Sequence, residues 1–472
     1  MYKALCFVDD EQGRDVELLM PLIYYAETYL NCDVKFVFVW DIFAIHRERP
    51  DIVILPNTVG SQWYFEVSKY AHDQNIPVFA LISEGNFRTN GTFNYWGYNT
   101  SKIYFQEFVC HWSKRTRDFL KNELPQYAKQ MVLTGATGFD RYKIYQFPTK
   151  EEFLQRKGMA GYKKIIGYAG WAFGKMYSDI GRKEIIAGHK DKAEARLKWM
   201  EKQMYEVENI LRQLIENNKD ILFILKVHPN ETHPHIAHEN PNEMIRLRKY
   251  SNVLYVKNDE NIQDLIAISD LWMGFETTTA LEAWMLNKET ILINPDPNFA
   301  RDYVHAGSII GIDYEGIENY INEYYNTGKI QAFHASEKQA IRKNIIEETI
   351  GFDDGFNHLR AAYYLKESLL KSEKMTFNPK FNMRFFLRSL SQKVGSIFYN
   401  RELFLKLPRF KKTVWIFERC KLKNIDALKK KYYPYLDKFY AKHGMNSKYS
   451  QSEFWHNYRI MNSKKIDSNV RK

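Results

Sequence analysis

The feature that most restricts the fold of this chain is a repeated alternation of short apolar runs with helical segments. Apolar runs rich in Val, Ile and Leu occupy residues 4–8, 34–39, 52–55 and 78–82, and helical spacing covers 16–30 and 61–72. Runs of this length and composition are typical of strands buried on both faces. Strands that alternate with helices indicate a parallel sheet covered by helices, so the first 150 residues are predicted to form a Rossmann-like domain.

A second series of the same kind follows a segment at 145–162 that contains Pro148 and two glycines and is interpreted as a linker. Its strands are predicted at residues 164–168, 221–227, 253–256, 271–273 and 290–293, with helices at 192–217, 262–267 and 278–286. The predicted fold class is therefore α/β, with Rossmann-like domains at 1–150 and 160–335 that face each other across a cleft. Residues 336–374 are predicted to be closing helices.

Charge separates the remaining residues from the rest. Residues 375–472 hold 23 Lys and Arg against 6 Asp and Glu, a net charge of +17, whereas the whole chain carries +11 and the first 374 residues therefore carry 11 − 17 = −6. Basic residues interleaved with aromatic ones favour an anionic membrane surface. A helical appendage with a solvated basic face is the alternative, and nucleic acid is disfavoured because the positive charge is confined to this mainly helical tail.

The N-terminal segment lacks the pattern of a signal peptide, and no apolar run approaches the roughly 18 to 20 residues that span a bilayer. The four cysteines form no C-x-x-C pair and are interpreted as reduced thiols. These observations predict a cytoplasmic protein that is peripheral on the inner membrane.

Polar residues follow two strands of the first series. Glu84 and Gly85 come directly after residues 78–82 and precede Arg88, and Gly135 ends the strand predicted at 130–134. Partial burial raises the pKa of a carboxyl group and suits it to general-base work. The alternative for Glu84 is an ordinary turn in which it pairs with Arg88, and for Gly135 a tight turn.

The second series ends its strands in groups suited to phosphate. Lys226, His228 and Pro229 close the strand at 221–227, where His228 could donate to a phosphate oxygen and Lys226 could add positive charge. Thr277, Thr278 and Thr279 open a helix after Glu276, and free N–H groups and hydroxyls at a helix start bind anions. A simple threonine N-cap is the alternative. Gly170 lies in a glycine-rich loop, 167–175, that could let the backbone approach a phosphate.

Together these segments resemble GT-B-fold glycosyltransferases of bacterial capsule and lipopolysaccharide synthesis, above all those that use CMP-activated Kdo or sialic acid. The likeness covers roughly residues 1–370 in layout. It rests on Ser83-Glu84-Gly85 followed by Phe87-Arg88, on His228-Pro229, and on the three threonines at 277–279. One departure is Ser83, which stands where the family has a first acidic residue.

The resemblance implies a role for each motif. Glu84 would be the general base, with Gly85, Arg88 and Gly135 on the acceptor side. His228 would bind or protonate the leaving phosphate, the three threonines would hold it, and Glu276 or Glu282 would bind the nucleoside. The chain contains no Asp-x-Asp, which favours a metal-independent mechanism.

The expected function is therefore transfer of a sugar from a nucleotide donor, with a CMP-sugar favoured, to a glycan or lipid-linked acceptor. No metal, no further cofactor and no nucleic-acid partner are expected. The alternatives are a polyol-phosphate transferase of the CDP-glycerol type, a nucleotide-sugar epimerase, and a non-catalytic binding protein with the same fold.

Overall fold

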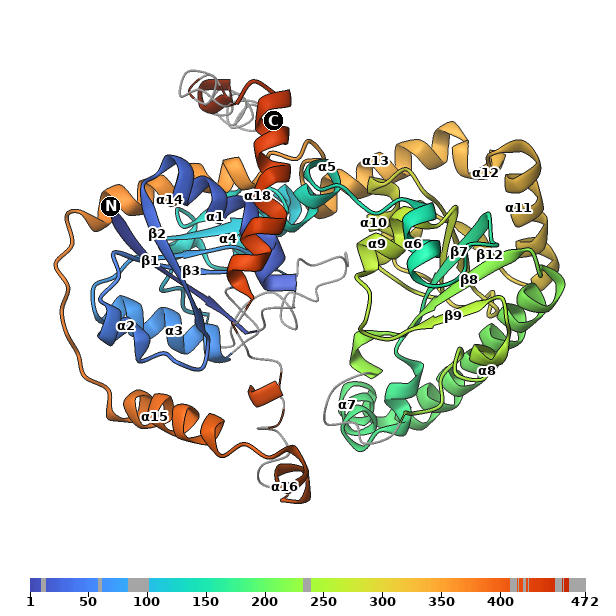
Figure 1. Cartoon of the computed structure of the whole chain (residues 1–472), viewed down its shortest axis with the longest axis horizontal. Coiled ribbons are helices and arrows are strands. Elements are labelled where there is room, and N and C mark those ends of the chain that lie inside the picture. Colours follow the sequence, from blue (N-terminus) through green and yellow to red (C-terminus); the bar gives the residue numbers. More distant parts are fainter. Residues whose placement is uncertain are drawn as a thin grey trace. The chain divides into compact units, whose positions relative to one another are not determined.

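The chain divides into two compact units in the computed structural model, which describes residues 1–9, 14–57, 62–83, 102–231, 239–407, 414, 416–418, 422, 424–445, 452 and 454–457. Unit 1 comprises the described residues of Met1–Asn86, Asn90–Gln146 and Ile346–Lys472, and unit 2 those of Phe147–Ile345 (Figure 1). The basic C-terminal region, 375–472, therefore groups with the N-terminal residues.

Unit 1 is built on a six-stranded sheet whose strands pair in the order β2-β1-β3-β4-β5-β6, all parallel. The strands are β1 (Tyr2–Val8), β2 (Cys32–Phe38), β3 (Ile52–Leu55), β4 (Val78–Ala80), β5 (Phe108–His111) and β6 (Met131–Leu133). Its helices are α1 (Arg14–Tyr29), α2 (Ala44–Glu48), α3 (Gln62–Asp73), α4 (Lys114–Glu123), α5 (Arg141–Ile144), α14 (Asn357–Ser372), α15 (Met383–Ile397), α16 (Arg401–Lys406) and α18 (Ile425–Lys442). Strand β5 was not predicted from the sequence.

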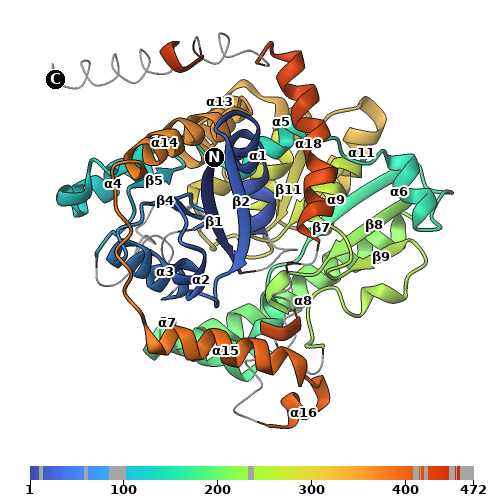
Figure 2. The same ribbon diagram turned by 60° about the vertical axis from the view of Figure 1, so that its left-hand side comes forward.

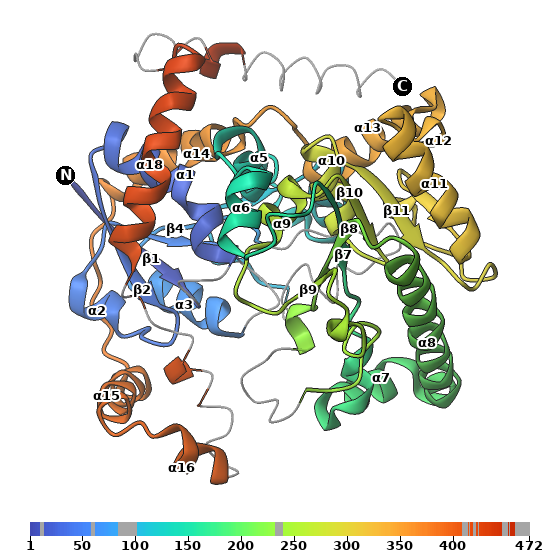
Figure 3. The same cartoon turned by 45° about the vertical axis from the view of Figure 1, so that its right-hand side comes forward.

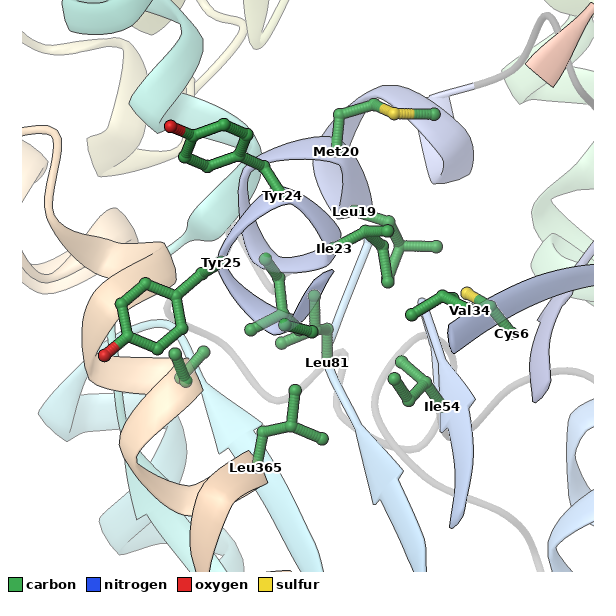
Figure 4. Packing of buried hydrophobic residues seen from close by; sticks show 14 of the residues in the cluster. Cys6, Leu19, Met20, Ile23, Tyr24, Tyr25, Val34, Ile54, Leu81 and Leu365 are labelled. Atoms are coloured by element: carbon green, nitrogen blue, oxygen red, sulfur yellow. The ribbon is translucent and has the colours of Figure 1, made fainter. Parts of the chain in front are cut away.

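Helices cover both faces of this sheet, as the continuous apolar strands predicted. Successive residues of β1 alternate between two cores: Cys6 and Val8 belong to one, Leu5 and Phe7 to the other. The first core receives α1, α14 and α18, and Figure 4 shows part of this packing around α1. The second core receives α2 and α3. Because the side chains of a strand alternate, a strand can be apolar throughout only when both faces are covered.

Unit 2 contains a second parallel sheet, with strand order β12-β11-β10-β7-β8-β9 (Figure 3). Its strands are β7 (Lys164–Ala169), β8 (Ile221–Lys226), β9 (Val253–Val256), β10 (Leu271–Gly274), β11 (Glu289–Ile293) and β12 (Ile309–Gly311), of which β12 was not predicted. Its helices are α6 (Lys150–Arg156), α7 (Asp179–His189), α8 (Ala193–Asn217), α9 (Ile262–Ile268), α10 (Thr279–Met285), α11 (Tyr314–Thr327) and α12 (Gln331–His334); α13 (Ser336–Ile350) runs on into unit 1.

The segment at 145–162 is not the plain linker that its proline and glycines suggested. It contains α6, which begins with a capping box between Thr149 and Glu152. Phe153 and Leu154 of this helix are buried in the same core as α9 and one face of the unit 2 sheet. Capping residues and two large apolar side chains therefore make this segment part of unit 2.

Helix α18 packs against α1 through a set of ordered polar contacts. The hydroxyl of Tyr432 donates to Glu17 at 2.8 Å, and the hydroxyl of Tyr433 donates to Glu27 at 2.6 Å. Lys429 also forms an ion pair with Glu27. Aromatic residues of the basic region that the sequence suggested for a membrane surface are thus partly used inside unit 1.

A buried chain of hydrogen bonds joins α18 to the rest of the unit. Asp140 accepts the backbone N–H groups of Asn357 and His358 at 3.1 and 2.7 Å, and its Oδ2 lies 2.8 Å from His358 Nδ1. A carboxylate only accepts, so Nδ1 carries a proton, and His358 Nε2 lies 2.9 Å from the Tyr440 hydroxyl; in the neutral ring, Nε2 accepts this bond. All three side chains are buried. Within the described residues, no helix is both long and apolar enough to cross a bilayer.

We expect Asp140→Asn to destabilise the protein by about 3 kcal/mol and Tyr440→Phe by about 1 kcal/mol. Asp140 accepts three hydrogen bonds in a buried site, whereas Tyr440 contributes one hydroxyl to the chain. Urea denaturation of both variants beside Ser391→Ala, an exposed serine of α15, measures the difference. Equal losses for the two buried variants would contradict the importance given to the carboxylate.

Candidate functional site

The candidate site in unit 2 lies at the edge of the sheet where its strands end. All strands are parallel, so the loops that follow β7, β8, β10 and β11 leave from this same edge. The chain proceeds from β7 through β8 to β9 on one side and then crosses to β10 on the other side of β7. Such a reversal of strand order is where ligands bind in open α/β sheets.

His228 follows β8 directly, and its ring orientation is set by a backbone contact. The N–H of Asn230 donates to His228 Nδ1 at 3.1 Å, within the turn η6 (Pro229–Glu231). A ring nitrogen that accepts a hydrogen bond carries no proton, so neutral His228 has its proton on Nε2. The ring can therefore donate from Nε2, which is what a contact with a phosphate oxygen requires.

The glycine-rich loop after β7 uses its N–H groups inside the protein. Gly170 donates to the carbonyl of Lys226 at 2.9 Å, Trp171 to Glu243 Oε1 at 3.1 Å, and Gly174 to Glu231 Oε1 at 2.6 Å. A Cβ at Gly170 would lie 2.5 Å from Met244 Cε. The backbone N–H of Gly170 is thus already paired, and this glycine permits close packing.

Two buried carboxyl groups support this loop. Glu231 also accepts from Asn242 at 2.8 Å, and Glu243 accepts the Tyr168 hydroxyl at 3.2 Å. Burial raises the pKa of Glu231 to about 7. Burial and then the charge of Glu231 raise the pKa of Glu243 well above its usual value. The pair therefore keeps a proton at neutral pH, because two charged carboxylates so placed would repel each other without solvent.

The three threonines form a compact turn between β10 and α10. Thr277 Oγ1 accepts the N–H of Thr279 at 3.1 Å, and Trp272 Nε1 donates to Thr279 Oγ1 at 2.8 Å. Thr278, the exposed residue before α10, makes no side-chain capping bond. The bond that Thr277 Oγ1 accepts from Thr279 is of the capping kind, so the N-cap alternative stays open. A Cβ at Gly274 would lie 2.5 Å from Thr277 Cγ2, which explains the glycine at the end of β10.

Arg301 ties the ends of β10 and β11 together beside Glu276. Its guanidinium donates to the carbonyls of Phe275 and Ile293. Burial lowers the pKa of Arg301 to about 10, while the charge of Glu276 acts in the opposite direction. Glu276 Oε1 also lies 3.8 Å from His305 Nε2. Glu276 is thus partly buried beside Arg301 and His305. Glu282, on α10, is also partly buried.

Aromatic side chains form a cluster around these strand ends. The ring centroids of Trp199 and Phe299 are 4.7 Å apart, and those of Trp171 and Phe275 are 5.4 Å apart. Arg196 lies over the Trp199 ring at 4.2 Å. Trp171, Trp199 and Phe299 are only partly buried, so their rings offer a planar apolar surface of the kind on which a base can stack.

The remaining predicted residues are placed as follows. Lys226 is buried, and its ammonium donates to the carbonyls of Val227 and Lys257, while burial lowers its pKa to about 8. Pro229 begins η6 and is exposed. Gly135 lies in unit 1 with φ +83°, and a Cβ there would lie 1.9 Å from Asn357 Oδ1. Glu84, Gly85 and Arg88 lie outside the described residues.

The sequence reasoning missed Glu243 and Arg301 and assigned no role to Glu231. Glu243 and Arg301 follow no strand directly, so no position relative to a strand end singled them out. Folding brings them to the candidate site from loops distant in sequence. Within the described residues, no group of three or more His, Cys, Asp or Glu side chains is arranged to hold a metal ion.

No protein-family model and no curated protein matches this sequence. Among solved structures, the Staphylococcus aureus MnaA–UDP complex is similar at 14% identity, covering 81% of this chain and 100% of MnaA, with a TM-score of 0.51. UDP-GlcNAc 2-epimerase from Neisseria meningitidis bound to UDP-GlcNAc matches at 14% identity, 78% and 100% coverage and a TM-score of 0.47. Anabaena HepE with UDP and glucose matches at 13% identity, covering 79% of this chain and 100% of HepE, with a TM-score of 0.45.

The similarity to MnaA shows the fold, and it confirms the predicted class of two Rossmann-like domains with a helical C-terminal region. The predicted CMP-sugar glycosyltransferase is wrong. The finding that overturns it is the similar structure of MnaA, which holds UDP rather than a CMP-sugar and agrees better with the nucleotide-sugar epimerase that the sequence analysis left open. The coarser prediction of a GT-B-like fold is consistent with the MnaA structure.

We expect the stability of the protein to fall as pH rises from about 5 to 8 through the ionisation of Glu231 and Glu243. A carboxyl group with a raised folded-state pKa stabilises below its unfolded pKa and loses that contribution as pH rises through the folded pKa. Glu243→Gln should therefore gain stability relative to the wild type with increasing pH, because Gln carries no ionisable proton at this buried position. Urea titrations at several pH values measure this, with exposed Glu337→Gln as the control. A difference independent of pH would contradict the assignment.

Proposed function

We propose that unit 2 binds the UDP part of a nucleotide sugar where β7, β8 and β10 end, and that the protein acts on that sugar as an epimerase. The observation that carries the proposal is the order β10-β7-β8. It sets His228, after β8, and the threonine turn, after β10, on the two sides of the loop after β7. A fold shared with MnaA, whose structure holds UDP, supports UDP as the kind of ligand.

The groups at this edge match the parts of UDP in chemical type. His228 can donate from Nε2 to a diphosphate oxygen, and the exposed Thr278 hydroxyl adds a second donor. Glu276 and Glu282 can accept hydrogen bonds from ribose hydroxyls. The partly buried rings of Trp171 and Trp199 can stack on the base. Gly170, Pro229 and Lys226 would shape the site through the backbone and packing. The Gly170 N–H is already bonded to the Lys226 carbonyl, and the Lys226 ammonium already has two acceptors.

Epimerisation inverts one stereocentre of the sugar, so a proton must leave one face and return to the other. Reactions of this kind need a base and an acid but no second sugar as acceptor. Glu84 remains the sequence-based prediction for the base. Glu231 and Glu243 hold the loop after β7 and are positioning residues, because their Oε1 atoms bind its backbone. The specific reaction to test is 2-epimerisation of UDP-GlcNAc, which several similar structures carry in their names.

We expect UDP to stabilise the protein in a thermal-shift titration and CMP to have little effect. A ligand at 100 times its dissociation constant stabilises the folded state by about 2.7 kcal/mol. Incubation with UDP-GlcNAc, followed by proton NMR, should then show a second hexosamine epimer. A preference for CMP would contradict the proposed nucleotide. Binding of UDP-GlcNAc without conversion would contradict the proposed reaction.

We expect His228→Ala to weaken UDP binding about tenfold or more while uridine binding stays unchanged. Hydrogen bonds to charged groups contribute about 1.5–3 kcal/mol, and uridine lacks the diphosphate. Isothermal titration calorimetry with both ligands measures the split. His189→Ala, which removes an exposed histidine of α7, is the matched control. Equal weakening of both ligands would show that His228 does not contact the phosphates.

A further inference from the structure

Helix α15 exposes its apolar side and packs its polar and aromatic side against unit 1. The ring centroid of Phe385 lies 4.9 Å from that of Tyr70, and Ser389 donates to Asp41 at 2.5 Å. The Arg388 guanidinium lies 3.6 Å from the centroid of the Trp63 ring and donates to Glu66 at 3.0 Å. These contacts hold one face of α15 against the rest of unit 1 and thereby set the direction of the opposite face. The course of α15 is drawn in Figure 2.

The opposite face is a continuous apolar stripe. Its members recur at the three- and four-residue spacing of one helix face and are 46% to 75% exposed: Met383, Leu387, Leu390, Val394 and Ile397. Phe398 follows the helix at 73% exposure, and Leu403 and Leu407 in and after α16 are also exposed. At about 100° per residue the stripe covers about a quarter of the helix circumference. Single exposed apolar residues are common, but a continuous set of them marks a binding surface.

Positive charge borders this stripe. Residues 380–407 contain six basic side chains against the single acid Glu402. Arg384 and Arg388 pair with Glu66, and Arg401 pairs with Glu418, each at 3.0 Å. The remaining three are Lys380, Lys393 and Lys406. On the helix, Arg384 and Lys393 fall on opposite borders of the stripe, and both are exposed. An apolar band between two basic borders is the arrangement of helices that lie in the plane of an anionic bilayer surface.

We propose that α15 and α16 form a docking surface for an anionic lipid bilayer, which goes beyond the proposed nucleotide-sugar activity. The apolar stripe enters the boundary between headgroups and acyl chains, and the basic borders pair with lipid phosphates. Charge favours this partner over a second copy of the chain, because two such surfaces would bring excess positive charge together. Helix α18, which also lies in the basic region, is not part of this docking surface. Its Tyr432 and Tyr433 instead donate to Glu17 and Glu27 of α1.

Vesicle flotation with the full chain tests the proposal. Vesicles of phosphatidylcholine with 30–40% phosphatidylglycerol should carry the protein, with at least tenfold weaker partitioning to phosphatidylcholine alone. The variant Leu387→Ser/Leu390→Ser should lose binding at least tenfold. Lys393→Glu/Lys406→Glu should lose a similar factor, and 0.5 M salt should weaken the wild type, because salt screens exposed charges.

The matched control is Leu370→Ser/Lys366→Glu, which makes the same kinds of change at exposed positions of α14. This control should bind vesicles as the wild type does. UDP binding by every variant shows that each is folded, and unchanged UDP binding alongside lost flotation separates this surface from the nucleotide site. Equal partitioning to neutral vesicles, or undiminished flotation of both α15 variants, would overturn the proposal. So would a concentration-dependent dimer, seen by light scattering, that the leucine variant abolishes without any effect on flotation.

Discussion

The parallel direction of the strands in each sheet is the constraint on which the rest of this structure depends. Parallel neighbours end at the same edge, so every loop that follows a strand leaves from one side of the sheet. In unit 2 this requirement gathers His228, the threonine turn and the loop after β7, although this loop and the threonine turn are more than a hundred residues apart in sequence. Burial of both sheet faces by helices leaves this edge as the place where polar groups can collect.

Ionisable side chains hold the loops at that edge of the sheet in two ways. Glu231 and Glu243 are buried under the loop after β7 and hold it through hydrogen bonds to Trp171 and Gly174. Burial raises the pKa of Glu231 to about 7 and the pKa of Glu243 well above its usual value, so the charged form of each carboxyl group is disfavoured there. Arg301 compensates on the other side by binding carbonyls at the ends of two strands. Glu231, Glu243 and Arg301 thus hold these loops in place, and this role does not require any of them to contact a ligand.

The basic C-terminal region serves two different purposes in one segment of chain. Helix α18 closes the apolar face of α1, and Tyr440 completes the buried hydrogen-bond chain that begins at Asp140. Helix α15 does the reverse, since its polar side faces the protein and its apolar side faces outward. Composition alone makes the two helices look alike, because both combine Lys or Arg with aromatic residues. Their contacts distinguish a helix of the core from a helix whose apolar side is exposed.

The sequence by itself determined the fold class, because short β-branched runs and helical spacing are local properties that survive without knowledge of neighbours. It also placed His228 and Thr277 at strand ends. It did not reveal β5 or β12, which are three or four residues long and lack a distinctive pattern. Only the tertiary structure decided which N–H groups of the loop after β7 are hydrogen-bonded within the protein. It also decided which ring nitrogen of neutral His228 carries the proton, and where Glu243 and Arg301 lie. These depend on contacts between residues distant in sequence, which local composition does not encode.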